Sequence, residues 1–175
     1  ILAAKQATKT IPIVMVTTQD PVATGIVDSL ARPGGNITGL ARLTRELGGK
    51  RLELLKEVVP TVTRVGIIWA ADDEGSTIAF KQYESAARAL NLTLQSLTIR
   101  GPKADTDNAF KAAAEGKLTA LIAIRSGLVN RYQKNITDFA IANRLPSIFD
   151  GNDFVEAGGL MSYNTDDDES FKRAA

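Results

Sequence analysis

Residues 64–70 read Arg-Val-Gly-Ile-Ile-Trp-Ala, which is the strongest strand pattern in the chain. An apolar run of this length, rich in branched side chains, is typical of a strand that is buried on both faces. The next stretch, 76–90, has apolar residues at helical spacing and predicts an amphipathic helix. A buried strand followed by such a helix is the repeating unit of a parallel sheet.

The alternation continues on both sides of this unit. Further strands are expected at 12–17, 37–40, 92–99, 119–124, 147–149 and 160–163. Further helices are expected at 22–30, 44–59, 105–114 and 128–143, with Asp105 as the cap of its helix. Strands separated by helices predict an α/β fold in which helices flank parallel sheets on both faces.

A glycine-rich break at 32–36 divides the pattern into two parts. We expect residues 1–40 to form part of an N-terminal lobe, and 41–165 to form a second lobe with the order βαβαβαβ. Residues 166–175 place acidic before basic side chains, a charge order that predicts the start of a helix leading onward. Because the chain opens without Met on what reads as a helix tail, we interpret it as a fragment of a longer protein.

The composition excludes several kinds of chemistry. The chain has 175 residues, 44% hydrophobic and 23% charged, with a net charge of +1 and neither Cys nor His. Disulfides, Cys/His metal sites and Ser-His-Asp or Cys-His catalysis are therefore impossible within it. The balanced charge does not indicate a nucleic-acid partner, and no apolar run reaches the roughly 20 residues of a membrane helix.

The location of a ligand site follows from the fold class. In open α/β sheets, ligands bind outside the carboxyl ends of the strands, where helix N-termini offer unpaired N–H groups. Polar loops follow the expected strands at 17–21, 70–76, 125–127, 150–153 and 164–166. The candidate ligand-binding residues at these strand ends are Thr18, Asp20, Trp69, Ser76, Arg125, Ser126, Asp150 and Tyr163.

Each candidate also has a structural interpretation. Asp20, before Pro21, and Ser76 could simply cap helices. Arg125 could bind a carboxylate through paired hydrogen bonds or be a surface charge. Trp69 and Tyr163 could line a ligand or belong to the core.

The sequence gives little indication of two other kinds of site. The run Asp72-Asp73-Glu74 lacks the spacing of a calcium loop and is interpreted as a solvated acidic loop. Neither the dinucleotide-binding nor the phosphate-binding glycine motif occurs, which disfavours a nucleotide enzyme. No metal and no cofactor are expected.

Long strings of residues resemble the ABC-transporter substrate-binding proteins of the tryptophan-binding-like family. The strings, in the family's order and over nearly the whole chain, are Ile11–Val14, Asp20–Val22, Leu30–Leu40 (LARPGGNITGL), Lys50–Glu57 (KRLELLKE) and Phe154–Tyr163 (FVEAGGLMSY). Family members have the bilobed type 1 periplasmic-binding-protein fold. They are made with a signal peptide, are secreted or lipid-anchored outside the cytoplasmic membrane, and hand small solutes to a membrane permease.

The resemblance also implies a cleft between the lobes. Its lining would be the Asp20 loop from the first lobe, and Ser76, the Arg125-Ser126 loop, Asp150 and Tyr163 from the second. Relatives often carry Pro-Asp or Thr-Asp where this chain has Arg125-Ser126. A carboxylate-bearing solute is therefore expected to fit better than a plain α-amino acid.

Two other functions remain open from the sequence. The same bilobed fold serves as the effector-binding domain of transcription regulators, which would add a DNA-binding domain. An α/β enzyme would have to rely on carboxylates, and Asp20, Asp150 and Asp153 form the only plausible acid–base set. The resemblance favours an extracytoplasmic solute-binding component of an ABC importer over both.

Overall fold

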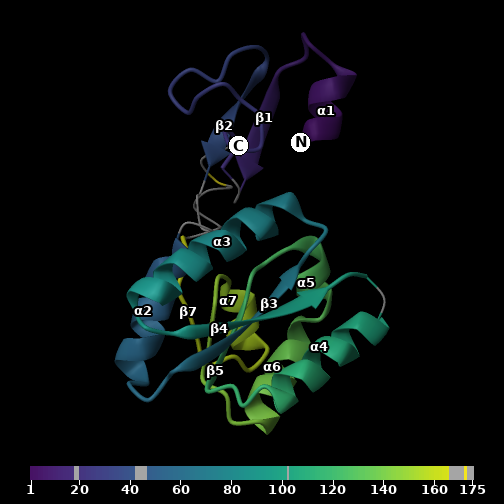
Figure 1. Cartoon of the computed structure of the whole chain (residues 1–175). Coiled ribbons are helices and arrows are strands. Elements are labelled where there is room, and N and C mark those ends of the chain that lie inside the picture. The colour runs from purple at the N-terminus through teal and green to yellow at the C-terminus, as the bar shows by residue number, and fades with distance from the viewer. Residues whose placement is uncertain (18–19, 42–46, 102, 166–171, 173–175) are drawn as a thin grey trace. The chain divides into compact units, whose positions relative to one another are not determined.

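A computed structural model describes residues 1–17, 20–41, 47–101, 103–165 and 172 (Figure 1). The chain divides into two compact units, Ile1–Arg45 with Thr165–Ala175, and Glu46–Asn164. The predicted helix 166–175 and the candidate Thr18 lie outside the described residues, Lys172 apart. In chain order the elements are α1 (Leu2–Ala7), β1 (Ile13–Thr17), β2 (Ile37–Ala41), α2 (Gly48–Val58), β3 (Arg64–Ala70), α3 (Glu74–Ala89), β4 (Thr93–Ile99), α4 (Lys103–Glu115), β5 (Ala120–Ala123), α5 (Gly127–Arg131), α6 (Gln133–Ala142), β6 (Ser147–Phe149), α7 (Asn152–Glu156) and β7 (Met161–Ser162).

The second unit is built on a parallel sheet with strand order β4-β3-β5-β6-β7. The strand that dominates the sequence, β3, pairs on both sides and is buried along most of its length. β7 lies at the sheet edge and pairs with β6. The predicted α/β architecture, with parallel strands linked through helices, is confirmed for this unit.

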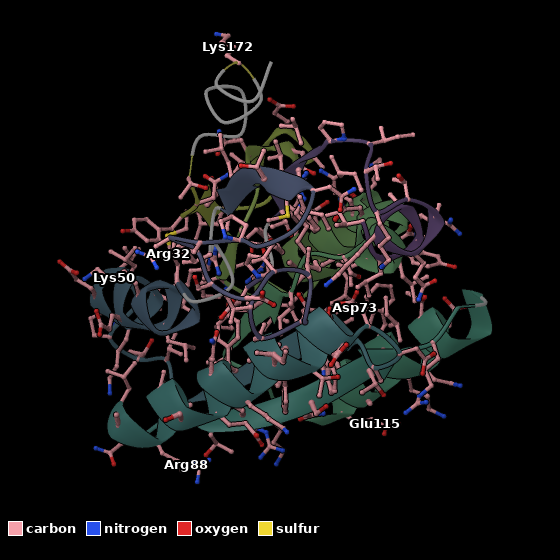
Figure 2. All side chains as sticks on the ribbon, turned by 90° about the horizontal axis from the view of Figure 1, so that it is seen from above. Arg32, Lys50, Asp73, Arg88, Glu115 and Lys172 are labelled. Carbon is pink, nitrogen blue, oxygen red and sulfur yellow. The ribbon has the colours of Figure 1, made fainter. Side chains whose placement is uncertain are left out.

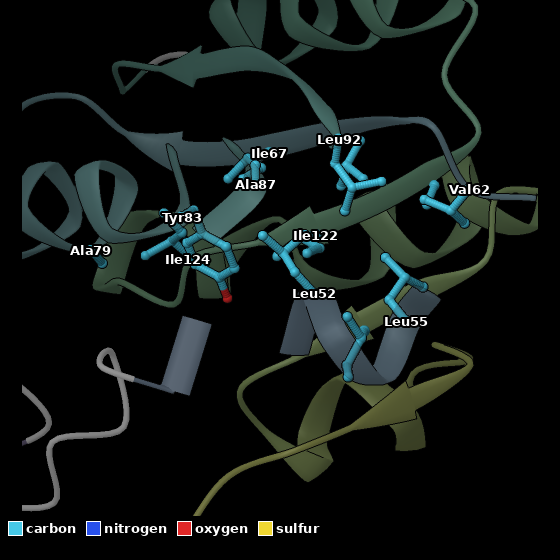
Figure 3. Packing of buried hydrophobic residues seen from close by; sticks show 13 residues of the cluster. Leu52, Leu55, Val62, Ile67, Ala79, Tyr83, Ala87, Leu92, Ile122 and Ile124 are labelled. Atoms are coloured by element: carbon cyan, nitrogen blue, oxygen red, sulfur yellow. The ribbon is translucent and has the colours of Figure 1, made fainter. Parts of the chain in front are cut away.

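Helices cover both faces of this sheet. On one face, α2 and α3 pack their apolar side chains against alternate strand residues, and Figure 3 shows members of this cluster, among them Leu52, Tyr83 and Ile122. On the other face, α4 to α7 pack against the intervening strand residues, such as Leu121 and Phe149. Because successive side chains of a strand point to opposite faces, each buried strand supplies both cores.

The first unit holds a two-stranded parallel sheet, β1 with β2, and a small core of Met15, Ile26, Val27 and Ile37. The predicted helix at 22–30 is wrong, because the segment forms turns. Gly25 adopts a φ of +66° and so ends the first turn, and the amides of Ile26 and Val27 both donate to the carbonyl of Pro21.

Three details of the second unit also differ from the prediction. The helix expected at 128–143 is two helices, α5 and α6, because Tyr132 leaves the helical conformation (φ −107°, ψ 15°) between them. Asp105 lies within α4 rather than at its cap, since the helix begins at Lys103. The short helix α7 was not predicted; it carries the fully buried Phe154.

The outer faces of α3 and α4 carry exposed charges. Arg88 on α3 and Glu115 on α4 are exposed and lie at the periphery in Figure 2. Exposed ion pairs such as Lys50–Glu53 and Lys134–Asp138 contribute little to stability. Among the described residues, no helix combines the length and the hydrophobicity needed to cross a bilayer.

Candidate functional site

The strand register brings the carboxyl ends of β3, β5, β6 and β7 to one edge of the sheet. Ile68 pairs with Ala123, Ala123 with Phe149, and Phe149 with Ser162, so these residues lie in one row. The next row consists of Trp69, Ile124, Asp150 and Tyr163. Ser76 lies in the first turn of α3, which follows β3, and Arg125 and Ser126 lie between β5 and α5, so the candidates of this unit gather at the same edge.

Ser76 offers a buried hydroxyl at the N-terminus of α3. The cap of this helix is Asp73, whose Oδ1 accepts the amide of Ser76 at 2.6 Å, so the prediction of Ser76 as a cap is wrong. Ser76 is fully buried, and its Oγ has no hydrogen-bond partner in the described part of the chain. An unpaired buried hydroxyl costs free energy, which a ligand atom could recover.

Arg125 is held in place by a carboxylate on the next loop. Its Nη2 lies 3.3 Å from Oδ2 of Asp153, and both side chains are about two-thirds buried. With its amide turned to satisfy both neighbours, Asn130 presents its oxygen to Arg125 Nε at 3.2 Å. A Cβ at Gly151 would overlap Asp153 and lie 3.1 Å from Arg125 Nη1, so glycine permits this close packing.

Ser126 serves as the cap of α5. Its Oγ accepts the amide of Val129 at 3.1 Å, and the residue is nearly buried. The hydroxyl therefore already has one hydrogen bond at the helix N-terminus. A hydroxyl can donate and accept at the same time, so a ligand acceptor could still receive its proton.

Beneath the edge lies a buried polar cluster that the sequence did not predict. Arg51 on α2 is 1% exposed; its Nε donates to the carbonyl of Tyr163 at 2.8 Å, and its Nη1 donates to Tyr83 Oη at 3.2 Å. Asp150 is 6% exposed, and its charge acts on Tyr83. The cluster joins α2, α3 and the ends of β6 and β7.

Tyr83 titrates abnormally in this cluster. Burial raises the pKa of its phenol, the neighbouring Arg51 opposes that shift, and the charge of Asp150 adds to it. The folded protein therefore favours the neutral phenol more strongly than the unfolded chain does. The stability that this provides is complete below pH about 10, the ordinary tyrosine value, and is lost as the pH rises toward the folded pKa.

We expect Tyr83→Phe to reduce the fall in the free energy of unfolding at alkaline pH. In wild type, the free energy of unfolding should fall more steeply above pH about 10 than in the variant, because Tyr83 can ionise only on unfolding. Urea denaturation at a series of pH values measures this difference. Parallel pH profiles for the two proteins would contradict the assignment.

Trp69 and Asp20 have structural partners of their own. The ring of Trp69 stacks on Phe80 of α3 at 4.7 Å, and its Nε1 donates to Ser96 Oγ at 2.9 Å. These contacts explain the position of Trp69 in the core between the sheet and α3. Asp20 lies in the first unit and accepts the amides of Val22 and Ala23, and thus caps a turn.

One hollow of the second unit lies away from the carboxyl ends of its strands. In the second unit, a hollow of about 280 Å³ lies beside the start of β6, lined by Ile141, Arg144, Pro146, Leu160 and their neighbours. Within the described residues, no group of three carboxylates could hold a metal ion. The assignment of the strand-end residues as a solute site stays a prediction.

Comparisons with known proteins agree with this architecture. The model of the family described as ABC transporter substrate binding protein matches residues 2–175. A protein named tyrosine-binding protein, from Clostridioides difficile (strain R20291), is 29% identical over 94% of this chain and 46% of its own length.

Solved structures share the fold. A conserved domain protein from Vibrio cholerae superposes with a TM-score of 0.84 at 29% identity, over 94% of this chain and 54% of the other. An ABC domain from Streptococcus pneumoniae in complex with L-Trp gives a TM-score of 0.80 at 22% identity, over 93% and 55%. The chain thus spans about half the length of these relatives and has an α/β fold of the type 1 periplasmic-binding-protein class. Since the family model extends over almost every residue, this chain belongs to the ABC transporter substrate-binding protein family.

Proposed function

We propose that this chain is part of the extracytoplasmic solute-binding component of an ABC importer, and that it binds a small organic solute bearing a carboxylate. The observation that carries the proposal is the gathering of Ser76, Arg125, Ser126 and Asp150 at one sheet edge of a chain in this family. The partner of the whole protein would be a membrane permease, and its location would be periplasmic or otherwise extracytoplasmic, with lipid anchoring an open alternative. Solute would be released unchanged.

The chemistry of the edge supports a carboxylate-bearing solute. The N-terminus of α3 and the buried Ser76 hydroxyl favour an anionic oxygen. A guanidinium has five N–H donors and can form several hydrogen bonds at once, one of which here goes to Asp153. Arg125 would give the carboxylate a charge-assisted hydrogen bond, and Asp153 would keep its side chain in place.

The relatives suggest an aromatic amino acid as the first solute to test. One relative is named for tyrosine and one related fold is in complex with L-Trp. Arg125 distinguishes the two parts of such a solute, because it would bind the carboxylate and repel the ammonium. L-tyrosine, its analogue without the ammonium, 3-(4-hydroxyphenyl)propanoate, and its analogue without the carboxylate, tyramine, form a matched set.

We expect Arg125→Gln to weaken binding of the two carboxylate-bearing probes at least tenfold, about 1.4 kcal/mol, and to spare tyramine. Isothermal titration calorimetry on the whole protein measures the dissociation constants. Arg131→Gln is the matched control, because Arg131 is exposed on the neighbouring helix α5. Equal weakening by both variants, or binding of tyramine in preference to the propanoate, would contradict the carboxylate assignment.

Experiments on the same whole protein also distinguish this proposal from the rival functions. A LacI family transcriptional regulator from Bifidobacterium animalis shares the fold with a TM-score of 0.61 at 13% identity, which concerns the fold alone. Sequence-specific DNA binding by the whole protein would favour the regulator. Conversion of any bound compound during incubation would favour an enzyme and overturn the transport proposal.

A further inference from the structure

Arg51 occupies an unusual place for an arginine. It is 1% exposed, and a buried charge is costly unless hydrogen bonds and nearby opposite charge compensate for it. Nε is bonded to the carbonyl of Tyr163 and Nη1 to the phenol of Tyr83. Gly48 allows the phenol to come this close, since a Cβ there would lie 3.0 Å from the ring of Tyr83.

The bond from Arg51 to Tyr163 joins two distant parts of the chain that both lead to the other unit. The chain passes from the first unit to the second at residues 45–46, and returns at residues 164–165. Arg51 lies in the first turn of α2, soon after the first crossing, and Tyr163 lies just before the second. Within the second unit, the Arg51 side chain thus links the segment by which the chain enters the unit to the segment by which it leaves.

The end of β7 depends on such an anchor. β7 comprises only Met161–Ser162 and lies at the sheet edge, where it pairs with β6. Beyond it, the amide of Tyr163 still donates to the carbonyl of Phe149 at 2.9 Å. Asp150 follows Phe149 directly, so the bond between Tyr163 and Phe149 lies next to two candidate solute residues, Tyr163 and Asp150.

We propose that Arg51 and Tyr83 are positioning residues of the solute site: they hold the end of β7, which is bonded to β6 next to Asp150, in the arrangement that binds solute, without touching the solute themselves. This proposal rests on the proposed function. If Arg51 and Tyr83 had a purely structural role, substitutions of them would lower stability everywhere in the second unit. If Arg51 and Tyr83 position the site, substitutions of these residues should loosen the end of β7 in particular. They should also weaken solute binding by the protein that is still folded.

The first test needs no ligand. Hydrogen–deuterium exchange of the whole, solute-free protein is compared in wild type, Arg51→Met, Arg51→Lys, Tyr83→Phe and, as the control, Lys50→Met. Lys50 is the residue before Arg51; its side chain is about half exposed and forms an ion pair with Glu53. The reporter is the amide of Tyr163, because its acceptor is Phe149 on β6.

We expect the Tyr163 amide to exchange at least tenfold faster in Arg51→Met, and several-fold faster in Tyr83→Phe. Arg51→Lys should lie between wild type and Arg51→Met, and Lys50→Met should match wild type. Amides of β3 and β5 should keep their wild-type rates. Unchanged exchange at Tyr163, or an equal rise across the whole sheet, would overturn the proposal.

The second test links the anchor to binding. Calorimetry with L-tyrosine, well below the melting temperature of every variant, should give a dissociation constant at least tenfold higher in Arg51→Met and unchanged in Lys50→Met. Wild-type affinity in Arg51→Met would overturn the link to the solute site. If wild type itself does not bind L-tyrosine, tyrosine is not the solute, and the exchange experiment still decides whether Arg51 positions the strand end.

Discussion

Phe149→Ala should lower the free energy of unfolding by about 3–5 kcal/mol, because it leaves a cavity in the core between the sheet and α4 to α7. Phe149 is fully buried on β6 and stacks on Phe154 with ring centroids 4.6 Å apart. A Cβ at Gly159 would lie 2.6 Å from the same ring, so the backbone at Gly159 packs closely against Phe149. Urea denaturation of the whole protein, followed by circular dichroism, measures the loss.

Phe110→Ala is the matched control for this prediction. Phe110 also stacks on a phenylalanine, Phe139, but it is only partly buried. Since the loss grows with the buried area and the cavity, we expect it to cost about half as much or less. Equal losses in the two variants would show that Phe149 does not occupy a tightly packed core. Phe149→Ala should also impair solute binding, because Asp150 follows it directly.

Gly39→Ala should destabilise the first unit by more than about 3 kcal/mol, because two penalties act together. Gly39 has a φ of +144°, which other residues rarely adopt. A Cβ there would overlap the carbonyl oxygen of Met15 and lie 2.6 Å from its amide nitrogen. Gly39 pairs with Met15 between β1 and β2, so relief of the overlap would break the pairing of this two-stranded sheet.

Gly25→Ala separates the two penalties. Gly25 also has a positive φ, +66°, but a Cβ there would meet nothing within 4 Å. It should cost only the conformational penalty of about 1–2 kcal/mol. Differential scanning calorimetry of the whole protein gives both values, and a loss in Gly39→Ala no larger than in Gly25→Ala would contradict the close approach of β1 and β2.

The strands were predictable because burial on both faces leaves a strong signal. The run 64–70 and the shorter runs at 119–124 and 147–149 are apolar after their first residue, and each contains a strand of the sheet. Helix ends were less predictable. Gly25 ends a turn in a segment whose composition suits a helix, and Tyr132 divides one expected helix into two.

The strand-end rule led to the candidate edge without any motif. It named Ser76, Arg125, Ser126 and Asp150 because each follows a strand, and parallel register then brings them to one edge. Whether they bind solute remains a prediction. Arg51 was missed because arginine on an amphipathic helix ordinarily faces solvent, and its partner Tyr163 is far away in sequence. The only available signal was its place in the string Lys50–Glu57 that resembles the family.

Native mass spectrometry of the gently purified whole protein tests the central claim most directly. Wild type should carry a small molecule at one per chain that is released unchanged on denaturation and contains a carboxylate. Ser76→Val and Arg125→Gln should lose most of it, because both residues lie at the strand ends. Ile141→Ser, in the hollow beside the start of β6, should keep it. Loss in Ile141→Ser with retention in Ser76→Val and Arg125→Gln, or release of a nucleotide, a metal or a converted product, would contradict the account.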